Sequence, residues 1–356
     1  HVAVQRAERL AAALNDKRRV SVICSLLTFS RFSMGQLGPA VDAGQRALAI
    51  AVELASVALE APANVYLGYV YGALGEFQKA KRHLLRNVGI LEGVLAHELF
   101  GLAAHPSVLT RVRLMSTHAE LGEFPQAIAV EVDVIKLSEA INQPFASQLT
   151  YWGIGRARAR KGDFQQAIAR LEMAERLTRE WDIIVMQPAA VTSLGFAYAS
   201  AGQSHAAVAL LDEALRLPPN VHLWSGGGWL GEGLLRLNRI EEASRVAANE
   251  LRFATKIGAR ADEAWALRLL GEIHSHPDSL NPKQAGENYG RALALARELS
   301  MRPLVAHCHL GMGRLYQCTD RNSDAKVELL RAVDMYRQMD MQFYLRQAEA
   351  DLRAIH

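Results

Sequence analysis

A few residues of this sequence have types and spacings that occur in chemical sites. Gly226, Gly228 and Gly231 follow the Gly-x-Gly-x-x-Gly pattern of dinucleotide-binding loops. That pattern needs a β-strand before it and an acidic residue about 20 positions later, within a βαβ unit. No strand pattern precedes Gly226, and the segment falls within a helical pattern. We therefore expect a locally frayed helix here and not a nucleotide site.

Possible metal ligands gather near the carboxyl terminus: His274, His276, His307, Cys308, His309 and Cys318. Structural zinc needs four ligands that converge in a tetrahedron. Residues two apart on a helix point away from each other, so His307 and His309 do not easily bind one ion. The sequence also lacks a nucleophile elbow and a G-x-x-x-x-G-K-[ST] phosphate loop. We expect no metal, no cofactor and no catalytic residue.

The composition limits the class of protein further. Half of the 356 residues are hydrophobic, and 40 basic residues balance 37 acidic ones, so no strong net field attracts nucleic acid or a membrane. Three cysteines are too few for a disulfide framework, and no apolar run has the length of a membrane span. We expect a cytoplasmic location. Because the chain begins with His1 and not with Met, we also expect a piece of a larger protein.

An internal repeat is the strongest signal in the sequence. Similar phrases close on an alanine about every 40 residues, at Ala40, Ala80, Ala127, Ala167, Ala207, Ala243, Ala285 and Ala325. The first helix of most repeats carries a glycine after a bulky residue, at Gly68, Gly155, Gly195, Gly231, Gly271 and Gly313. Glycine inside a helix costs about 1 kcal/mol relative to alanine, so its recurrence indicates that two helices approach closely. We expect each glycine to face the alanine of the second helix.

A second glycine ends the first helix in several repeats, at Gly35, Gly75, Gly122, Gly162 and Gly202. Glycine accepts the left-handed conformation that terminates a helix. Two residues later, an apolar side chain such as Phe77, Phe124 or Phe164 is expected to fill the turn. We expect one domain over residues 1–356, with a half repeat in 1–16, eight helical hairpins in 20–340 and a capping helix in 341–356.

The repeat resembles the tetratricopeptide motif, which Leu194, Gly195, Tyr198, Gly202, Ala207, Leu211, Ala214 and Pro219 match at nearly every position. The family's period is about 34 residues, and the longer period here resembles the long-helix arrays of bacterial signal-transducing ATPases. The stretches 263–276, 289–316 and 332–352 resemble the tetratricopeptide tail of bacterial adenylate/guanylate cyclases that also carry an AAA-type ATPase. The resemblance implies an all-α, right-handed superhelix in which each hairpin contacts its neighbours.

The register of the repeat predicts which side chains line the concave inner wall. This set, the predicted inner-wall residues, is Phe29, Tyr69, Trp152, Arg156, Arg160, Phe196, Glu232, Arg236, Trp265, Arg268, Glu272, His307 and Arg314. Aromatic residues and arginines are enriched at the energetic centres of protein interfaces. We expect a protein or peptide partner at this wall, and the ATPase or cyclase domains of a parent protein are one candidate.

Other functions stay open beside the interaction module. The superhelix would enclose a small effector molecule if the chain were a sensor domain. The arginine-rich segment 156–161 suggests nucleic acid, which the near-neutral charge argues against. The lysine and asparagine of the chaperone-binding carboxylate clamp are missing at the matching positions. The sequence does not decide the oligomeric state.

Overall fold

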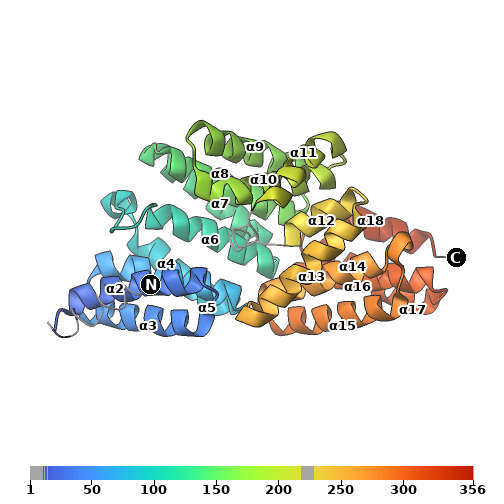
Figure 1. Ribbon diagram of the computed structural model, residues 1–356, viewed down its shortest axis with the longest axis horizontal. Coiled ribbons are helices and arrows are strands. Elements are labelled where there is room, and N and C mark those ends of the chain that lie inside the picture. The colour runs from blue at the N-terminus through green and yellow to red at the C-terminus, as the bar shows by residue number, and fades with distance from the viewer. Residues whose placement is uncertain (1–10, 12, 14, 218–227, 356) are drawn as a thin grey trace.

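The computed structural model describes residues 11 and 13 and the ranges 15–217 and 228–355. All regular structure in these ranges is helical, and consecutive helices pair as hairpins (Figure 1). The all-α fold predicted from the repeat is therefore confirmed. The half repeat predicted for 1–16 falls largely outside the described residues, and so does Gly226.

Eight hairpins and one final helix follow one another in the described ranges. Their helices are α2 (Lys17–Ser33), α3 (Leu37–Glu53), α4 (Val57–Ala73), α5 (Phe77–Ile90), α6 (Pro106–Leu121), α7 (Phe124–Ile141), α8 (Pro144–Lys161), α9 (Phe164–Glu180), α10 (Gln187–Ser200), α11 (Ser204–Arg216), α12 (Gly228–Arg236), α13 (Ile240–Ile257), α14 (Arg260–His274), α15 (Pro282–Glu298), α16 (Arg302–Cys318), α17 (Asn322–Gln338) and α18 (Gln342–Arg353). The last of these packs on α17, where the sequence predicts a capping helix.

The longest connection between two described hairpins joins α5 to α6. It contains the 3-10 turn η1 (Gly93–His97), and shorter turns η2 (Ile184–Met186) and η4 (Pro277–Ser279) lie in later connections. The Ser107 hydroxyl donates a hydrogen bond to the Ala96 carbonyl at 2.6 Å, which ties the connection to the start of α6. This insert accounts for the one long interval in the repeat.

The two helices of a hairpin occupy different layers. The first helix is buried on almost every side, as in α10, whereas α11 buries only the stripe Ala207, Leu211 and Ala214. First helices therefore form the inner layer of the superhelix and second helices form the outer layer. None of the described helices is long and apolar enough to cross a membrane.

The turn inside the hairpins has the predicted backbone. Gly122 and Gly162 have φ angles of 75° and 94°, in the left-handed region. Phe124 and Phe164 begin the following helices and are buried. A glycine stop followed by an aromatic plug thus closes these hairpins.

The side chain that lies nearest to the glycine of the first helix is a leucine and not the alanine that we expected. A Cβ atom built on Gly155 would lie 2.5 Å from Leu171 Cγ, and one on Gly195 would lie 2.8 Å from Leu211 Cδ2. Each leucine follows the repeat alanine by one helical turn, because the side chain that fills the space left by glycine must be long. The alanines themselves are fully buried between the two helices: Ala80, Ala167, Ala207, Ala243 and Ala325.

The same arrangement recurs with two variations. Gly68 faces Leu84 and Gly313 faces Leu329, as in the hairpins above. Gly271 instead faces the ring of Tyr289, and Gly231 faces Leu269 of the following hairpin. The space beside each of these glycines is thus filled by one bulky side chain, and the helix that supplies this side chain varies.

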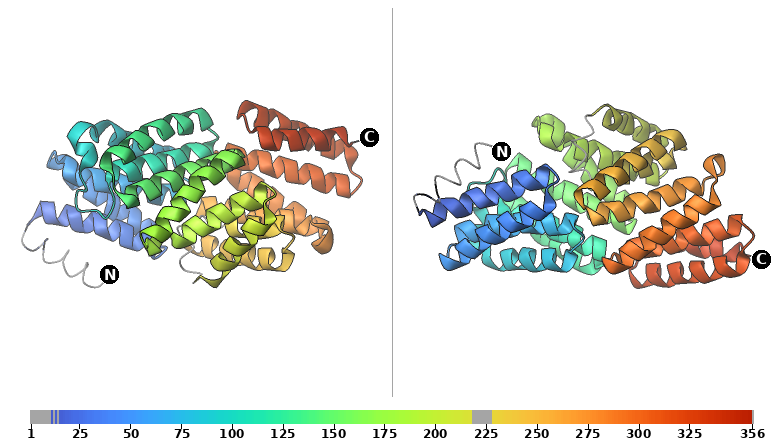
Figure 2. Two further views of the ribbon diagram at one scale, coloured as in Figure 1. Left: turned by 90° about the horizontal axis from the view of Figure 1, so that it is seen from above. Right: turned by 60° about the horizontal axis from the view of Figure 1, so that its bottom comes forward.

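The superhelix coils tightly enough to bring early turns against late hairpins. Gly75 lies against Leu299, and Gly122 lies against Met339. Helix α4 contacts α14 and α6 contacts α16, and Figure 2 shows teal helices meeting orange helices near the middle of the molecule. Contacts between hairpins thus extend beyond the sequence neighbours that the resemblance implies, because the superhelix brings the second hairpin against the seventh and the third against the eighth.

Candidate binding site on the inner wall

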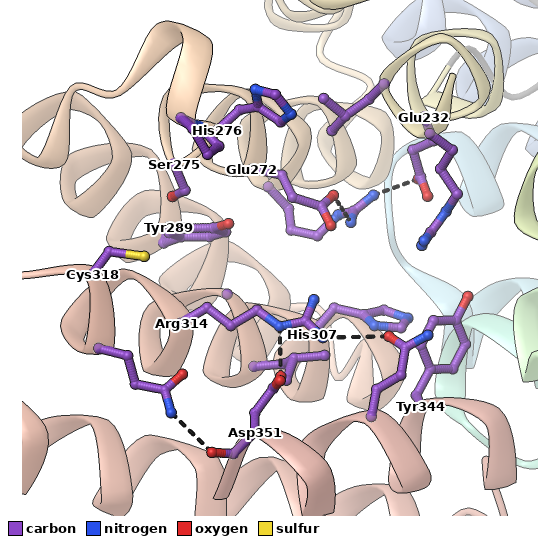
Figure 3. Close-up of a pocket in the computed structure, with 18 residues that line it drawn as sticks. Glu232, Glu272, Ser275, His276, Tyr289, His307, Arg314, Cys318, Tyr344 and Asp351 are labelled. Carbon is purple, nitrogen blue, oxygen red and sulfur yellow. Dashed lines mark hydrogen bonds and ion pairs between the residues drawn. The ribbon is translucent and has the colours of Figure 1, made fainter. Parts of the chain in front are cut away.

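Two hollows open on the inner wall of the superhelix. The larger one, here named the carboxyl-terminal cavity, has a volume of about 490 Å³ and is lined mainly by α12, α14, α16 and α18 (Figure 3). The smaller one, here named the central pocket, has a volume of about 120 Å³ and is lined mainly by α4, α6, α8, α12 and α14. Trp265 lines the central pocket, and Arg268, one turn later on α14, lines the cavity.

The predicted inner-wall residues divide between these hollows. Those in the central pocket are Tyr69, Trp152, Arg156, Arg160 and Trp265. Those in the carboxyl-terminal cavity are Glu232, Arg236, Arg268, Glu272, His307 and Arg314. Phe29 and Phe196 line neither hollow. The Phe29 ring lies 5.1 Å from the Tyr66 ring, and Phe196 is 2% exposed and packs on Phe164 and Trp229, so Phe196 is a core residue.

The register missed several residues of the two hollows, among them Arg113, Glu120, Trp229, Asp262 and Tyr344. The third hairpin lacks the bulky-residue–glycine pair that anchors the register elsewhere, so its inner residues could not be assigned. Counting back from the turn glycine would have found Glu120, because it precedes Gly122 as Arg160 precedes Gly162. Tyr344 belongs to α18, which stands outside the repeat pattern.

In the central pocket, Arg160 holds an aromatic ring and a carboxylate together. Its guanidinium lies 3.7 Å from the ring centre of Trp265 and 3.0 Å from a Glu120 carboxylate oxygen. The Trp265 indole N–H donates to the other Glu120 oxygen at 2.9 Å. Arg160 is itself buried, so this three-residue cluster joins α6, α8 and α14 at fixed geometry.

Arg156 occupies the next inward position of α8, between two tryptophans. Its guanidinium lies 4.8 Å from the Trp152 ring centre and 4.7 Å from the Trp229 ring centre. Burial, with Arg160 and Arg113 close by, lowers the pKa of Arg156 to about 9. A lowered arginine pKa means that burial disfavours the positive charge, so an anion bound in the pocket would stabilise that charge.

The charges that line the central pocket do not balance. Among the described residues, three arginines line it (Arg113, Arg156 and Arg160) against two carboxylates, Glu120 and Asp262. The Arg113 guanidinium stacks 3.8 Å from the Tyr69 ring centre. The pocket thus combines aromatic surfaces with one excess positive charge, which suits an acidic side chain.

The carboxyl-terminal cavity contains two fixed arginine–carboxylate groups on facing walls (Figure 3). On one wall, buried Arg268 pairs with Glu232 at 2.5 Å and with Glu272 at 2.6 Å. On the other wall, Arg314 pairs with Asp351 at 2.6 Å. Burial disfavours the charged form of Arg268, but the two glutamates outweigh burial and raise its pKa.

His307 lies in this cavity as a neutral ring. Its Nδ1 atom is 2.8 Å from the Tyr336 hydroxyl, and its ring makes an edge contact with Tyr344 at 4.5 Å. Burial lowers the His307 pKa well below its usual value, and Arg268 and the other surrounding arginines lower it further. A neutral imidazole offers hydrogen bonds here without adding to the charge of the cavity.

The histidines and cysteines considered as metal ligands make other contacts. His309 pairs with Glu328 at 2.5 Å, and the His274 ring nitrogen lies 3.1 Å from the Asn288 amide. Burial raises the pKa of the Cys308 thiol to about 12. Within the described part of the chain, no three such residues group as a metal site would require.

The arginine-rich segment of α8 does not form a free basic surface. Arg158 pairs with Glu131 at 2.7 Å, and Lys161 pairs with Asp340 at 2.9 Å. These pairs hold neighbouring and distant hairpins together. They leave little of the segment's charge for a phosphate backbone, which weakens the nucleic-acid alternative.

Comparisons with known proteins identify solved structures of similar fold. No protein-family model matches the sequence, and no curated protein matches it either. Among solved structures, a Rap protein complexed with competence and sporulation factor aligns with a TM-score of 0.62 and 14% identity, over 80% of this chain and 76% of that chain. NprR in complex with its cognate peptide NprX aligns with a TM-score of 0.52 and 18% identity, over 79% and 83%.

A third structure is a signal transduction ATPase with numerous domains and a tetratricopeptide repeat sensor, from Pyrococcus horikoshii. It aligns with a TM-score of 0.51 and 14% identity, over 99% of this chain and 51% of that chain. The present chain has the tetratricopeptide-repeat fold. At such identities the likeness shows the fold alone. The tetratricopeptide array of this chain thus resembles about half of the P. horikoshii protein.

Proposed function

We propose that this tetratricopeptide array is a non-catalytic interaction module that binds an acidic peptide segment of a partner protein on its inner wall. The observation that carries the proposal is the central pocket, where three arginines lie against aromatic rings with an excess of positive charge. Arginine and tryptophan dominate the binding energy of many interfaces, and a carboxylate is the natural partner of a guanidinium.

The dimensions of the wall favour a segment over a compact ligand at this point. The central pocket has room for one side chain, about 120 Å³, and it lies beside the larger carboxyl-terminal cavity. An extended segment would place one acidic side chain among the arginines and lie along the inner wall on either side. Two proteins that share the fold, Rap and NprR, were solved with a factor and with a cognate peptide, which supports this mode.

The finer proposal concerns the protein that contains the array. The carboxyl-terminal stretches resemble the tails of bacterial cyclase–ATPase proteins, and the P. horikoshii protein carries its repeats as a sensor. We propose that the array is a cytoplasmic regulatory tail that couples partner binding to such a signalling enzyme. Its test is the affinity between this chain and the purified ATPase domain encoded by the same gene. Absence of binding, both alone and with a captured segment present, would contradict the coupling.

The peptide proposal is tested with an array of acidic and neutral peptides probed by the purified chain. We expect acidic peptides to be captured, and Arg156→Gln to weaken their binding about tenfold, because a charge-assisted hydrogen bond is lost. Arg245→Gln is the matched control, since Arg245 is exposed on the outer helix α13 and lines neither hollow. Equal capture by the wild type and by Arg156→Gln would remove the central pocket from the proposal.

A further inference from the structure

The carboxyl-terminal cavity contains one cation that the protein itself leaves available. Arg236, at the end of α12, lines the cavity and is exposed. Within the described ranges it makes no hydrogen bond and no ion pair, whereas Arg268 and Arg314 are both held by carboxylates. A guanidinium in a concave site with no protein partner is a ready binding group for a ligand carboxylate.

The same cavity contains a carboxylate, Glu272, that is ion-paired but still partly exposed. Glu272 shares Arg268 with Glu232, and 31% of its side chain is exposed. Burial opposes the ionisation of Glu272, but Arg268, Arg236 and Arg314 outweigh burial and lower its pKa, so the group stays charged. The charge of Arg236 therefore stabilises the ionised form of Glu272, although the two side chains form no ion pair.

We infer that the carboxyl-terminal cavity binds a small zwitterion, a free α-amino acid, with its carboxylate on Arg236 and its ammonium group on Glu272. An α-amino acid carries its two charges side by side. This suits Arg236 and Glu272, which have opposite charges and face one cavity without pairing with each other. Either charge alone fits less well, because a simple anion would leave Glu272 without a ligand ammonium group and a simple amine would leave Arg236 without a ligand carboxylate.

The rest of the cavity suits the side chain of such a ligand. A volume of about 490 Å³ lies in the range of small-molecule sites. Tyr289, Leu310 and Tyr344 supply apolar surface, and Ser275 and Gln347 supply polar groups. The ligand would tie α12 to α14. This site is separate from the central pocket, so it goes beyond the proposed peptide binding.

The experiment is a thermal-unfolding screen of the whole chain against each common α-amino acid at millimolar concentration, followed by calorimetry. For each hit, the N-acetyl and the carboxamide derivatives remove one charge at a time. We expect at least one amino acid to raise the Tm, because a ligand that binds only the folded state stabilises it. Both derivatives should bind at least about tenfold more weakly.

Variants assign the binding to the cavity. Arg236→Gln should weaken the hit about tenfold or more, Arg236→Lys should keep part of the affinity, and Arg245→Gln should change nothing. Arg156→Gln should also leave amino-acid binding intact, which separates this site from the proposed peptide site. The inference is overturned if no amino acid shifts the Tm, if a hit survives Arg236→Gln unchanged, or if both derivatives bind as tightly as the parent amino acid.

Discussion

The ammonium group of Lys161 lies 2.9 Å from the carboxylate of Asp340, although 179 positions separate the two residues. Lys161 ends α8 and Asp340 lies in the turn before α18, so the pair joins the fourth hairpin to the end of the superhelix. Close by, Gly162 lies against Tyr344. Such contacts turn an open array into a coil whose successive turns support each other, and they hold the walls of both hollows in place.

The coil contact at Gly162 is tested by a matched pair of alanine substitutions. Gly162 and Gly202 end equivalent helices with φ of 94° and 78°, so alanine is strained at both. Of the two, only Gly162 would bring its new Cβ against a helix far along the chain, 2.9 Å from Tyr344 Cε2 of α18. We expect Gly162→Ala to lower the free energy of unfolding by about 1 kcal/mol more than Gly202→Ala in chemical denaturation. Equal losses would show that the coil contact contributes nothing.

The Lys161–Asp340 pair should make a small contribution that depends on pH. Hydrogen bonds from Lys161 and Gln342 lower the Asp340 pKa. A carboxylate with a lowered folded pKa stabilises the fold above its unfolded pKa, and this stability disappears as the pH falls through the folded value. A double-mutant cycle with Lys161→Gln and Asp340→Asn should give a coupling of about 0.5 kcal/mol at pH 7, since Asp340 is exposed. Coupling that stays constant as the pH falls from 7 through the whole acid titration would contradict an ionic origin.

The packing of glycine against leucine predicts opposite effects at two helical glycines. Gly290 faces open space, so Gly290→Ala should stabilise α15 by about 0.5–1 kcal/mol through helix propensity alone. At Gly195 the new Cβ would meet Leu211 at 2.8 Å, so Gly195→Ala should destabilise the protein by about 1–2 kcal/mol. Thermal unfolding of both variants measures the difference. Stabilisation at Gly195 would count against the close approach of α10 and α11.

Removal of Arg268 should leave its two glutamates without a partner. We expect Arg268→Met to lower the free energy of unfolding by about 3 kcal/mol at pH 7, because a broken buried pair leaves charge uncompensated. In the wild type the Glu272 pKa is lowered, so its contribution is lost as the pH falls. In the variant the Glu272 pKa should rise. Glu272 then becomes protonated as the pH falls, which removes the cost of burying an unpaired carboxylate. The difference between variant and wild type should therefore shrink toward pH 4, and a constant difference would contradict this explanation.

The hairpins could be predicted from the sequence because each one depends on local rules. The signals lie within a single repeat: a left-handed glycine, an aromatic plug and a buried alanine. Gly162, Phe164 and Ala167 therefore identify a hairpin without tertiary information. The number of hairpins and the all-α fold follow from counting such repeats. The side chain nearest to each helical glycine was misassigned, since the pattern does not show which side chain is long enough to reach it.

The coil and the division of the inner wall could not be predicted in this way. Contacts such as Gly162 with Tyr344 depend on small rotations that accumulate over several hairpins, and no repeat encodes their sum. The register placed Arg156 and Arg236 on the inner wall, but it could not separate the central pocket from the cavity. Nor could it separate Trp152, which lines a hollow, from Phe196, which the neighbouring Trp229 covers.

Charge reversal at Arg156 decides whether the inner wall holds an acidic segment. The measurement is the Kd, by calorimetry, of a captured acidic peptide and of its lysine-substituted form for the wild type and for Arg156→Glu. We expect Arg156→Glu to lose the acidic peptide and to gain affinity for the lysine form, since the favoured charge of the ligand follows the charge at this position. If the acidic peptide binds both proteins equally well, the central pocket is not where the partner is held.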